Sequence, residues 1–159
     1  LIKSGLLPYG DIEKMDENNP TLFRNNINRH VSHIARTRIT SNKSPWLQGL
    51  EVGHQYQVAM SHGEGKFTAS QEVVQKLIEN GQVVTQYVNE NGIPTMNGID
   101  NINGSVMAIE GIVSEDGCIL GKMGHSERWE EGLFQNIEGD KDQNIFACGV
   151  NFFTHKKGA

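Results

Sequence analysis

Cysteine is scarce in this sequence: Cys118 and Cys148 are the only two among 159 residues. Two cysteines so far apart exclude a disulfide scaffold and a zinc knuckle, which need more paired thiols. A reducing, cytoplasmic setting is therefore the expectation. Neither cysteine lies on a strand-to-helix turn of small residues, where backbone N–H groups surround a nucleophile. Since both lie in apolar runs, we expect them to be buried and structural.

Long hydrophobic runs and an excess of basic residues are also absent. No window approaches the roughly 18 apolar residues of a membrane helix, and Leu1 to Gly10 does not have the composition of a signal peptide. The net charge is -5, whereas phosphate binding needs clustered Lys and Arg. The one basic cluster, between Arg24 and Arg38, is interleaved with apolar residues. We expect neither a membrane nor a nucleic acid as a partner.

The length of the chain limits how many domains it can contain. A sequence of 159 residues is one domain by length and is large enough to bury a core. The chain begins with leucine rather than methionine, so we expect a piece of a longer protein. Its glycines are spread along the chain, which predicts many tight turns rather than a linker.

The clearest predicted element is a helix from about Ser70 to Asn80. Ser70 is a natural N-cap, and Asn80-Gly81 is a natural left-handed stop. Apolar residues recur on one face of this helix, and a strand is expected directly after it, at Val83 to Val88. A helix followed by a strand is typical of an α/β fold. The apolar face consists of Val73, Val74, Leu77 and Ile78, and further strands are expected at His33 to Thr40 and Tyr56 to Met60.

A hairpin is predicted from Val106 to Met123, where Gly117 supplies the positive φ of the turn. Leu1 to Ser4 is expected to be the tail of a helix. The last segment, Gln143 to His155, is also expected to be helical. The apolar face of that last helix would consist of Ile145, Phe146, Val150 and Phe153.

His125 and Glu127 are candidate catalytic groups just past the second arm of the hairpin. In α/β sheets, ligands gather at the ends of strands. A histidine works as a general base when a neighbouring group orients its ring and stabilises the imidazolium, and a glutamate can do both. Taken alone, however, this spacing is more typical of a polar surface loop.

His62 and Glu64 repeat the same spacing after another predicted strand. Their loop lacks the G-x-x-x-x-G-K-[ST] pattern of a phosphate-binding loop, and no Cys-x-x-Cys follows to complete a zinc deaminase site. We expect a structured turn there. His30, His33 and His54 have no carboxylate or cysteine partners at ligand spacing, so no metal site is predicted.

Several segments together resemble the phosphoribosylformylglycinamidine synthase family. Ser61 to Phe67 is similar to its S-H-G-E-G-[RK]-[FY] loop. Asn101 to Ser105, followed by Ile109 to Ile112, is similar to its N-x-N-G-S and x-I-x-G-I segment. Gly121 to Arg128 is similar to its G-x-M-P-H-P-E-R motif. The order and spacing agree along nearly the whole chain, in the style of the long single-chain form of the enzyme. Leu6 to Gly10 and Leu22 to Asn25 are also similar to family segments.

The resemblance implies that residues 1–159 are the C-terminal portion of a class I glutamine amidotransferase domain. In that family a cysteine attacks the side-chain amide of glutamine and a His–Glu pair activates it; His125 matches the histidine and Glu127 the glutamate. The released ammonia passes to a synthetase domain of the same enzyme. There, ATP and magnesium drive its addition to formylglycinamide ribonucleotide in purine biosynthesis. The resemblance implies no cofactor and no metal in this chain.

The chain departs from the family pattern in three places. The G-x-C-N-G-x-Q elbow that carries the nucleophile, expected immediately before Leu1, is absent. Gly124 and Ser126 replace the two prolines of M-P-H-P-E-R, so we expect a less rigid loop. The segment after Asn25 differs from the family's R-F-E, which argues against carrying over substrate contacts to Asn25 or Arg29.

We therefore expect an α/β fold of the flavodoxin-like class I amidotransferase kind, without its N-terminal strands and nucleophile elbow. The expected function is glutamine hydrolysis within a larger ligase, with the isolated chain inactive. Two alternatives stay open. One is a non-catalytic interaction half-domain, and the other is an independent hydrolase that uses Cys118 or Cys148.

Overall fold

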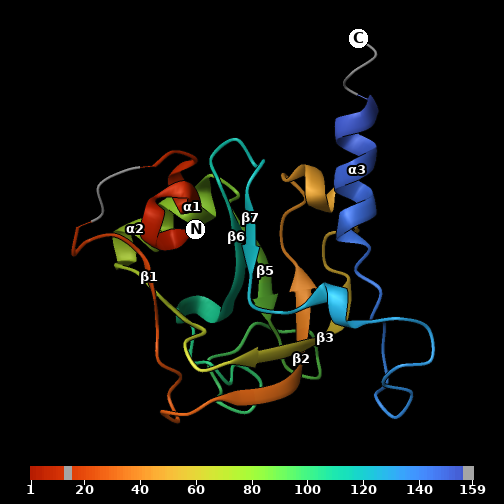
Figure 1. The fold of residues 1–159 in the computed structure, drawn as a ribbon. Coiled ribbons are helices and arrows are strands. Elements are labelled where there is room, and N and C mark those ends of the chain that lie inside the picture. The colour runs from red at the N-terminus through yellow and green to blue at the C-terminus, as the bar shows by residue number, and fades with distance from the viewer. Residues whose placement is uncertain (13–15, 156–159) are drawn as a thin grey trace.

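The computed structural model describes residues 1–12 and 16–155 (Figure 1). Its main sheet has the strand order β3-β2-β5-β6-β7, and every neighbouring pair in it is antiparallel. Two short strands, β1 and β4, pair separately. Helices α1 and α2 lie together on one side of the molecule, and α3 extends on the other (Figure 1). The strands are β1 Thr21–Phe23, β2 Val31–Ile39, β3 Gln55–His62, β4 Lys66–Thr68, β5 Val83–Tyr87, β6 Ile109–Val113 and β7 Leu120–Lys122; the α-helices are α1 Leu6–Tyr9, α2 Gln71–Glu79 and α3 Ile145–His155; the 3-10 helices are η1 Ile2–Ser4, η2 Pro45–Leu47, η3 Val106–Ala108 and η4 Ser126–Arg128.

The strands predicted at His33 to Thr40, Tyr56 to Met60 and Val83 to Val88 are confirmed as β2, β3 and β5. In β2, alternate side chains such as Ala35 and Ile39 are buried while the residues between them are more exposed. This period of two arises because successive side chains of a strand point to opposite faces of the sheet. Strand β5 is buried at most positions because it lies in the middle of the sheet.

Helix α2 is confirmed within a residue of its predicted bounds. The hydroxyl oxygen of Ser70 accepts a hydrogen bond from the backbone N–H of Val73 at 3.3 Å. Gly81 follows the helix with φ of 67°, in the left-handed region that glycine adopts without steric cost. Both ends of the helix are therefore fixed by the residues that the sequence pattern indicated.

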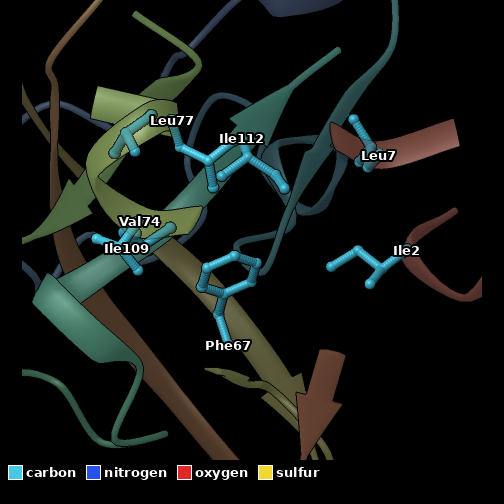
Figure 2. Packing of buried hydrophobic residues seen from close by; sticks show 8 residues of the cluster. Ile2, Leu7, Phe67, Val74, Leu77, Ile109 and Ile112 are labelled. Atoms are coloured by element: carbon cyan, nitrogen blue, oxygen red, sulfur yellow. The ribbon is translucent and has the colours of Figure 1, made fainter. Parts of the chain in front are cut away.

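The apolar face of α2 is narrower than predicted. Val74 and Leu77 are buried in a hydrophobic cluster, and burying such a side chain fully contributes about 1.5–3 kcal/mol. Val73 lies at the margin of this cluster, and Ile78 is 44% exposed. These two residues flank the buried stripe, because only one side of the helix touches the rest of the chain. Figure 2 shows Val74 and Leu77 packed with Phe67, Ile109, Ile112, Ile2 and Leu7.

The hairpin is confirmed as β6 and β7, but its first arm begins later than predicted. Residues 106–108 form η3, in which Met107 and Ala108 have positive φ. Before η3 the chain is held in a turn, because the Asn101 side chain bonds both the N–H and the carbonyl of Ser105. The strand therefore starts only at Ile109. The predicted turn residue, Gly117, has φ of 76°.

The last helix is confirmed as α3, but its predicted apolar face is wrong in part. Ile145 is buried, whereas Phe146 is 55% exposed and Val150 is 59% exposed. The face that packs includes Gly149, where a Cβ would lie 2.3 Å from the ring of Trp46. Helix α3 therefore meets the body of the chain mainly through η2 (Figure 1). Phe146, Val150 and Phe153 stay exposed.

The first segment, predicted as the tail of a helix, is η1, and Gly5 follows it in a left-handed conformation. Across residues 1–12 and 16–155, the structure contains no helix with both the length and the apolar character that a membrane crossing requires.

Candidate functional site

The loop after β7 carries His125 and is fastened to two strands of the sheet. The backbone N–H of His125 donates to the carbonyl of Ala59 in β3 at 2.7 Å. The N–H of Met123 donates to the carbonyl of Glu110 in β6 at 3.1 Å. His125 thus lies just past the end of β7 and beside β3, and η4 begins directly after it.

The structure brings His125 and Glu127 together. Nδ1 of His125 lies 2.6 Å from a carboxylate oxygen of Glu127. The carboxylate accepts, so Nδ1 carries the proton in this bond and Nε2 is left as the nitrogen that can accept a proton. The His125 side chain is 26% exposed and that of Glu127 is 53% exposed, so both are accessible from solvent. The pair has the geometry of an oriented general base.

The charge of Glu127 is favoured by this contact. Partial burial alone would raise the pKa of its carboxyl group, but the hydrogen bond from His125 and a backbone N–H together lower it. The carboxylate is therefore ionised near neutral pH and can stabilise an imidazolium that forms on His125.

The ring of His62 lies against the ring of His125. The two ring centroids are 5.3 Å apart and the planes are inclined by 17°, which is a stacked arrangement. Nε2 of His62 donates to the carbonyl of Met123, two residues before His125. Burial lowers the pKa of His62; the Met123 hydrogen bond opposes this effect, and nearby His125 adds to it. His62 is therefore predominantly neutral at neutral pH and supports the loop from the side of β3.

The loop of His62 is itself held by Asn25, which is 1% exposed. Its side-chain amide donates to the carbonyls of His62 at 2.6 Å and Arg29 at 3.1 Å, and its oxygen accepts from the N–H of Gly65. The structured turn predicted at this loop is confirmed. Because its polar atoms are occupied within the chain, Asn25 has a structural role here, in line with the sequence argument against substrate contacts.

A buried ion pair beneath the His125 loop was missed by the sequence reasoning. Lys122 and Glu110 lie 3.6 Å apart, with side chains 7% and 0% exposed. Burial lowers the pKa of Lys122, and the neighbouring Glu110 carboxylate opposes that shift. The available signal was a glutamate inside the apolar run of β6, since charged residues are almost never fully buried without a partner.

The two cysteines are only partly buried, so the prediction of buried cysteines is wrong. Cys118 lies near the hairpin turn, where its thiol is 3.8 Å from the carbonyl oxygen of Asp116. Cys148 lies on α3, whose contact with the body is narrow, and partial burial raises the pKa of its thiol. The two thiols thus lie on different elements from the His125 loop.

A groove of about 510 Å³ runs beside β7 and opens next to His125. It is lined by both members of the His–Glu pair and by apolar residues of β7 and α3. The charged end and the apolar wall adjoin each other, so a ligand or a chain segment in the groove would reach the imidazole. The lining includes Trp46, Cys118, Leu120, His125, Glu127 and Phe146.

Several other polar residues singled out by sequence have internal partners. Asn101 closes the turn before η3, and the Asn103 amide donates to the Tyr87 hydroxyl at 3.0 Å. His30 bonds Ser61. Within residues 1–12 and 16–155, no three His, Cys, Asp or Glu side chains are grouped so as to hold a metal ion.

Comparison with known proteins gives consistent results. A family model described as a CobB/CobQ-like glutamine amidotransferase domain matches residues 1–153. The chain is 32% identical over 139 residues to the phosphoribosylformylglycinamidine synthase subunit PurQ of Rhodopseudomonas palustris (strain BisB18). It is 35% identical over 138 residues to the subunit of the same name from Chlorobaculum tepidum.

These alignments cover 87% of this chain but 54% and 56% of the two relatives, so the chain spans about half the length of the curated relatives it matches. Among solved structures, the chain is similar to one described as "Structure of PurLQS from Thermotoga maritima". The TM-score is 0.62 at 22% identity, over 85% of this chain and 53% of that one. The expected α/β amidotransferase fold is thereby confirmed.

Proposed function

Because the chain belongs to the family of CobB/CobQ-like glutamine amidotransferase domains, we propose that it supplies His125 and Glu127 to glutamine hydrolysis in a phosphoribosylformylglycinamidine synthase. The observation that carries this proposal is the 2.6 Å hydrogen bond from Nδ1 of His125 to the Glu127 carboxylate. The names of the two curated relatives support the choice of synthase.

In the proposed reaction, Nε2 of His125 takes the proton of a cysteine thiol, and the thiolate attacks the side-chain amide carbon of glutamine. The same proton then passes to the amide nitrogen, the C–N bond breaks and ammonia leaves, with a thioester remaining. A water molecule, deprotonated by His125, hydrolyses the thioester to glutamate. Glu127 keeps the imidazole in the required tautomer and stabilises its charged form.

The nucleophile in this proposal belongs to a segment outside residues 1–159. Cys118 and His125 line the same groove but lie at opposite ends of β7, and Cys148 lies on α3. The open groove beside His125 offers room for a cysteine-bearing turn to approach. The isolated chain should consequently be inactive as a glutaminase.

The ammonia would be consumed in a synthetase part of the same enzyme, with ATP and magnesium acting there. No residue of this chain is assigned to ATP or magnesium. Glutamine is thus the small-molecule partner, the synthetase part is the protein partner, and the setting is cytoplasmic.

The test uses the full polypeptide that carries this chain, together with its synthetase part. His125→Ala should lower glutamine-dependent synthesis by about 10²-fold or more, the usual contribution of a positioned acid–base group. Synthesis from added ammonium should stay near the wild-type rate, since that route does not use the glutaminase site. An equal loss with glutamine and with ammonium would overturn the assigned role.

A further inference from the structure

One buried ion pair holds the two residues on either side of His125, Gly124 through its backbone and Ser126 through its hydroxyl. The Glu110 carboxylate accepts a hydrogen bond from the N–H of Gly124 at 2.5 Å. The ammonium of Lys122 donates to the carbonyl of Gly124 at 3.1 Å and to the hydroxyl of Ser126 at 3.2 Å. Residues 124 and 126 are the immediate neighbours of His125, so the ion pair contacts the loop on both sides of the histidine, at a backbone on one side and at a side chain on the other.

Further hydrogen bonds keep each charged group in place. The second carboxylate oxygen of Glu110 accepts from the hydroxyl of Thr85. Lys122 also donates to the side-chain oxygen of Gln143 at 2.8 Å, and Ser126 donates to the same oxygen at 2.6 Å. Gln143 is 1% exposed. The three donors of the ammonium are thereby directed at named oxygens, as a buried charge requires.

Gly124 and Ser126 make hydrogen bonds that the two prolines of the similar motif could not make. Proline has no backbone N–H and could not donate to Glu110 from position 124. A Cβ at position 124 would lie 3.0 Å from the Glu110 carboxylate and 2.7 Å from Cγ1 of Val58. Ser126 uses a hydroxyl that proline lacks. A less rigid loop is expected because the two prolines are missing. In the structure, hydrogen bonds at Gly124 and Ser126 hold the loop in place of the proline rings.

We propose that Glu110 and Lys122 are positioning residues for His125, holding its loop in the geometry required for proton transfer by clamping residues 124 and 126. In this proposal the pair acts on His125 through Gly124 and Ser126. This inference rests on the proposed glutaminase function. A misplacement of about 1 Å in a catalytic group costs up to about 10²-fold in rate, so loss of the clamp should reduce turnover.

The test compares Lys122→Met with Gln82→Met in the full polypeptide. Gln82 is a matched control because it is 2% exposed and its amide bonds two backbone carbonyls, Pro8 and Val113, in the core. Both variants should lower Tm. Only Lys122→Met should lower kcat for glutamine hydrolysis, by about 10-fold or more, while KM for glutamine and the ammonium-dependent rate change less than about twofold.

A milder variant keeps the proposal testable where Lys122→Met does not fold. Ser126→Ala leaves the ion pair whole and removes one of its contacts with the loop, so kcat should fall by about two- to fivefold with little change in Tm. The proposal is overturned if Ser126→Ala has the wild-type kcat, or if folded Lys122→Met and Gln82→Met lose kcat equally. A wild-type glutamine-dependent rate in His125→Ala would instead overturn the underlying function.

Discussion

The chain contains two His-x-Glu segments, each at the end of a strand, and their histidines make different hydrogen bonds. At the end of β7, His125 directs Nδ1 to Glu127 and leaves Nε2 to accept a proton. At the end of β3, His62 directs Nε2 to the carbonyl of Met123, and Glu64 is exposed. The two rings stack on each other, so the segments form one site with unequal members.

The difference arises from the path of the chain after each histidine. After His125 the chain turns at once into η4, which brings Glu127 back to the ring. After His62 the chain passes through a loop into β4, held by Asn25 at both ends, and Glu64 makes no hydrogen bond or ion pair with residues in the described part of the chain. Equal spacing in sequence therefore gives a hydrogen-bonded His–Glu pair in one place and a histidine bonded to a backbone carbonyl in the other.

Replacing the two glutamates separately should sharpen this contrast most. Glu127→Gln keeps the size of the side chain but removes the charge that stabilises an imidazolium on His125, so kcat for glutamine hydrolysis should fall by about 10-fold to 10²-fold. Glu64→Gln should stay within about twofold of wild type, because surface substitutions without partners have small effects. Steady-state kinetics on the full polypeptide measure both, and a larger loss for Glu64→Gln would reverse the assignment.

A smaller effect is expected at His62. His62→Ala removes the stacked ring and the bond to the Met123 carbonyl, and this should lower kcat by about three- to tenfold through looser placement of His125. His62→Phe keeps a stacking surface without the hydrogen bond and should fall between His62→Ala and wild type. If His62→Phe were as inactive as His125→Ala, His62 would carry chemistry of its own.

The smallest effect concerns stability and pH. The pKa of His62 is lowered in the folded state, so below the unfolded value of about 6.5 the unfolded chain binds a proton that the folded chain resists. His62 therefore lowers the free energy of unfolding as pH falls from about 7.5 to about 5.5. Replacing it with Gln should reduce this drop.

Urea denaturation midpoints of wild type and His62→Gln at both pH values measure the effect. Gln can still donate to the Met123 carbonyl, so the two proteins should be close in stability at the higher pH. A pH dependence that is unchanged in His62→Gln would show that His62 does not titrate differently on folding.

The local sequence pattern was enough to predict elements that begin or end at a capping or turn residue. Ser70 and Gly81 delimit α2, and Gly117 marks the turn of the hairpin. The apolar face of α3 was not predictable in the same way. Its period is helical, but whether Phe146 and Val150 are covered depends on other segments, and α3 contacts mainly Trp46 and its neighbours.

The site was predictable only in part for the same reason. The positions of His125 and Glu127 followed from a resemblance of motifs, and their contact is local, two residues apart. The stacking of His62 on His125 and the pairing of Glu110 with Lys122 join residues 63 and 12 positions apart. Such contacts depend on strand order and register, which local sequence patterns do not determine.

Chemical rescue is the most direct test of the claim that His125, and not His62, is the acid–base group. Glutamine hydrolysis by His125→Ala and by His62→Ala is measured in the full polypeptide, with and without added imidazole. We predict that His125→Ala is at least about 10-fold slower than His62→Ala, and that imidazole raises only the rate of His125→Ala, because only there is an acid–base group missing. A loss at His62→Ala that equals or exceeds the loss at His125→Ala, or rescue of His62→Ala alone, would contradict the account.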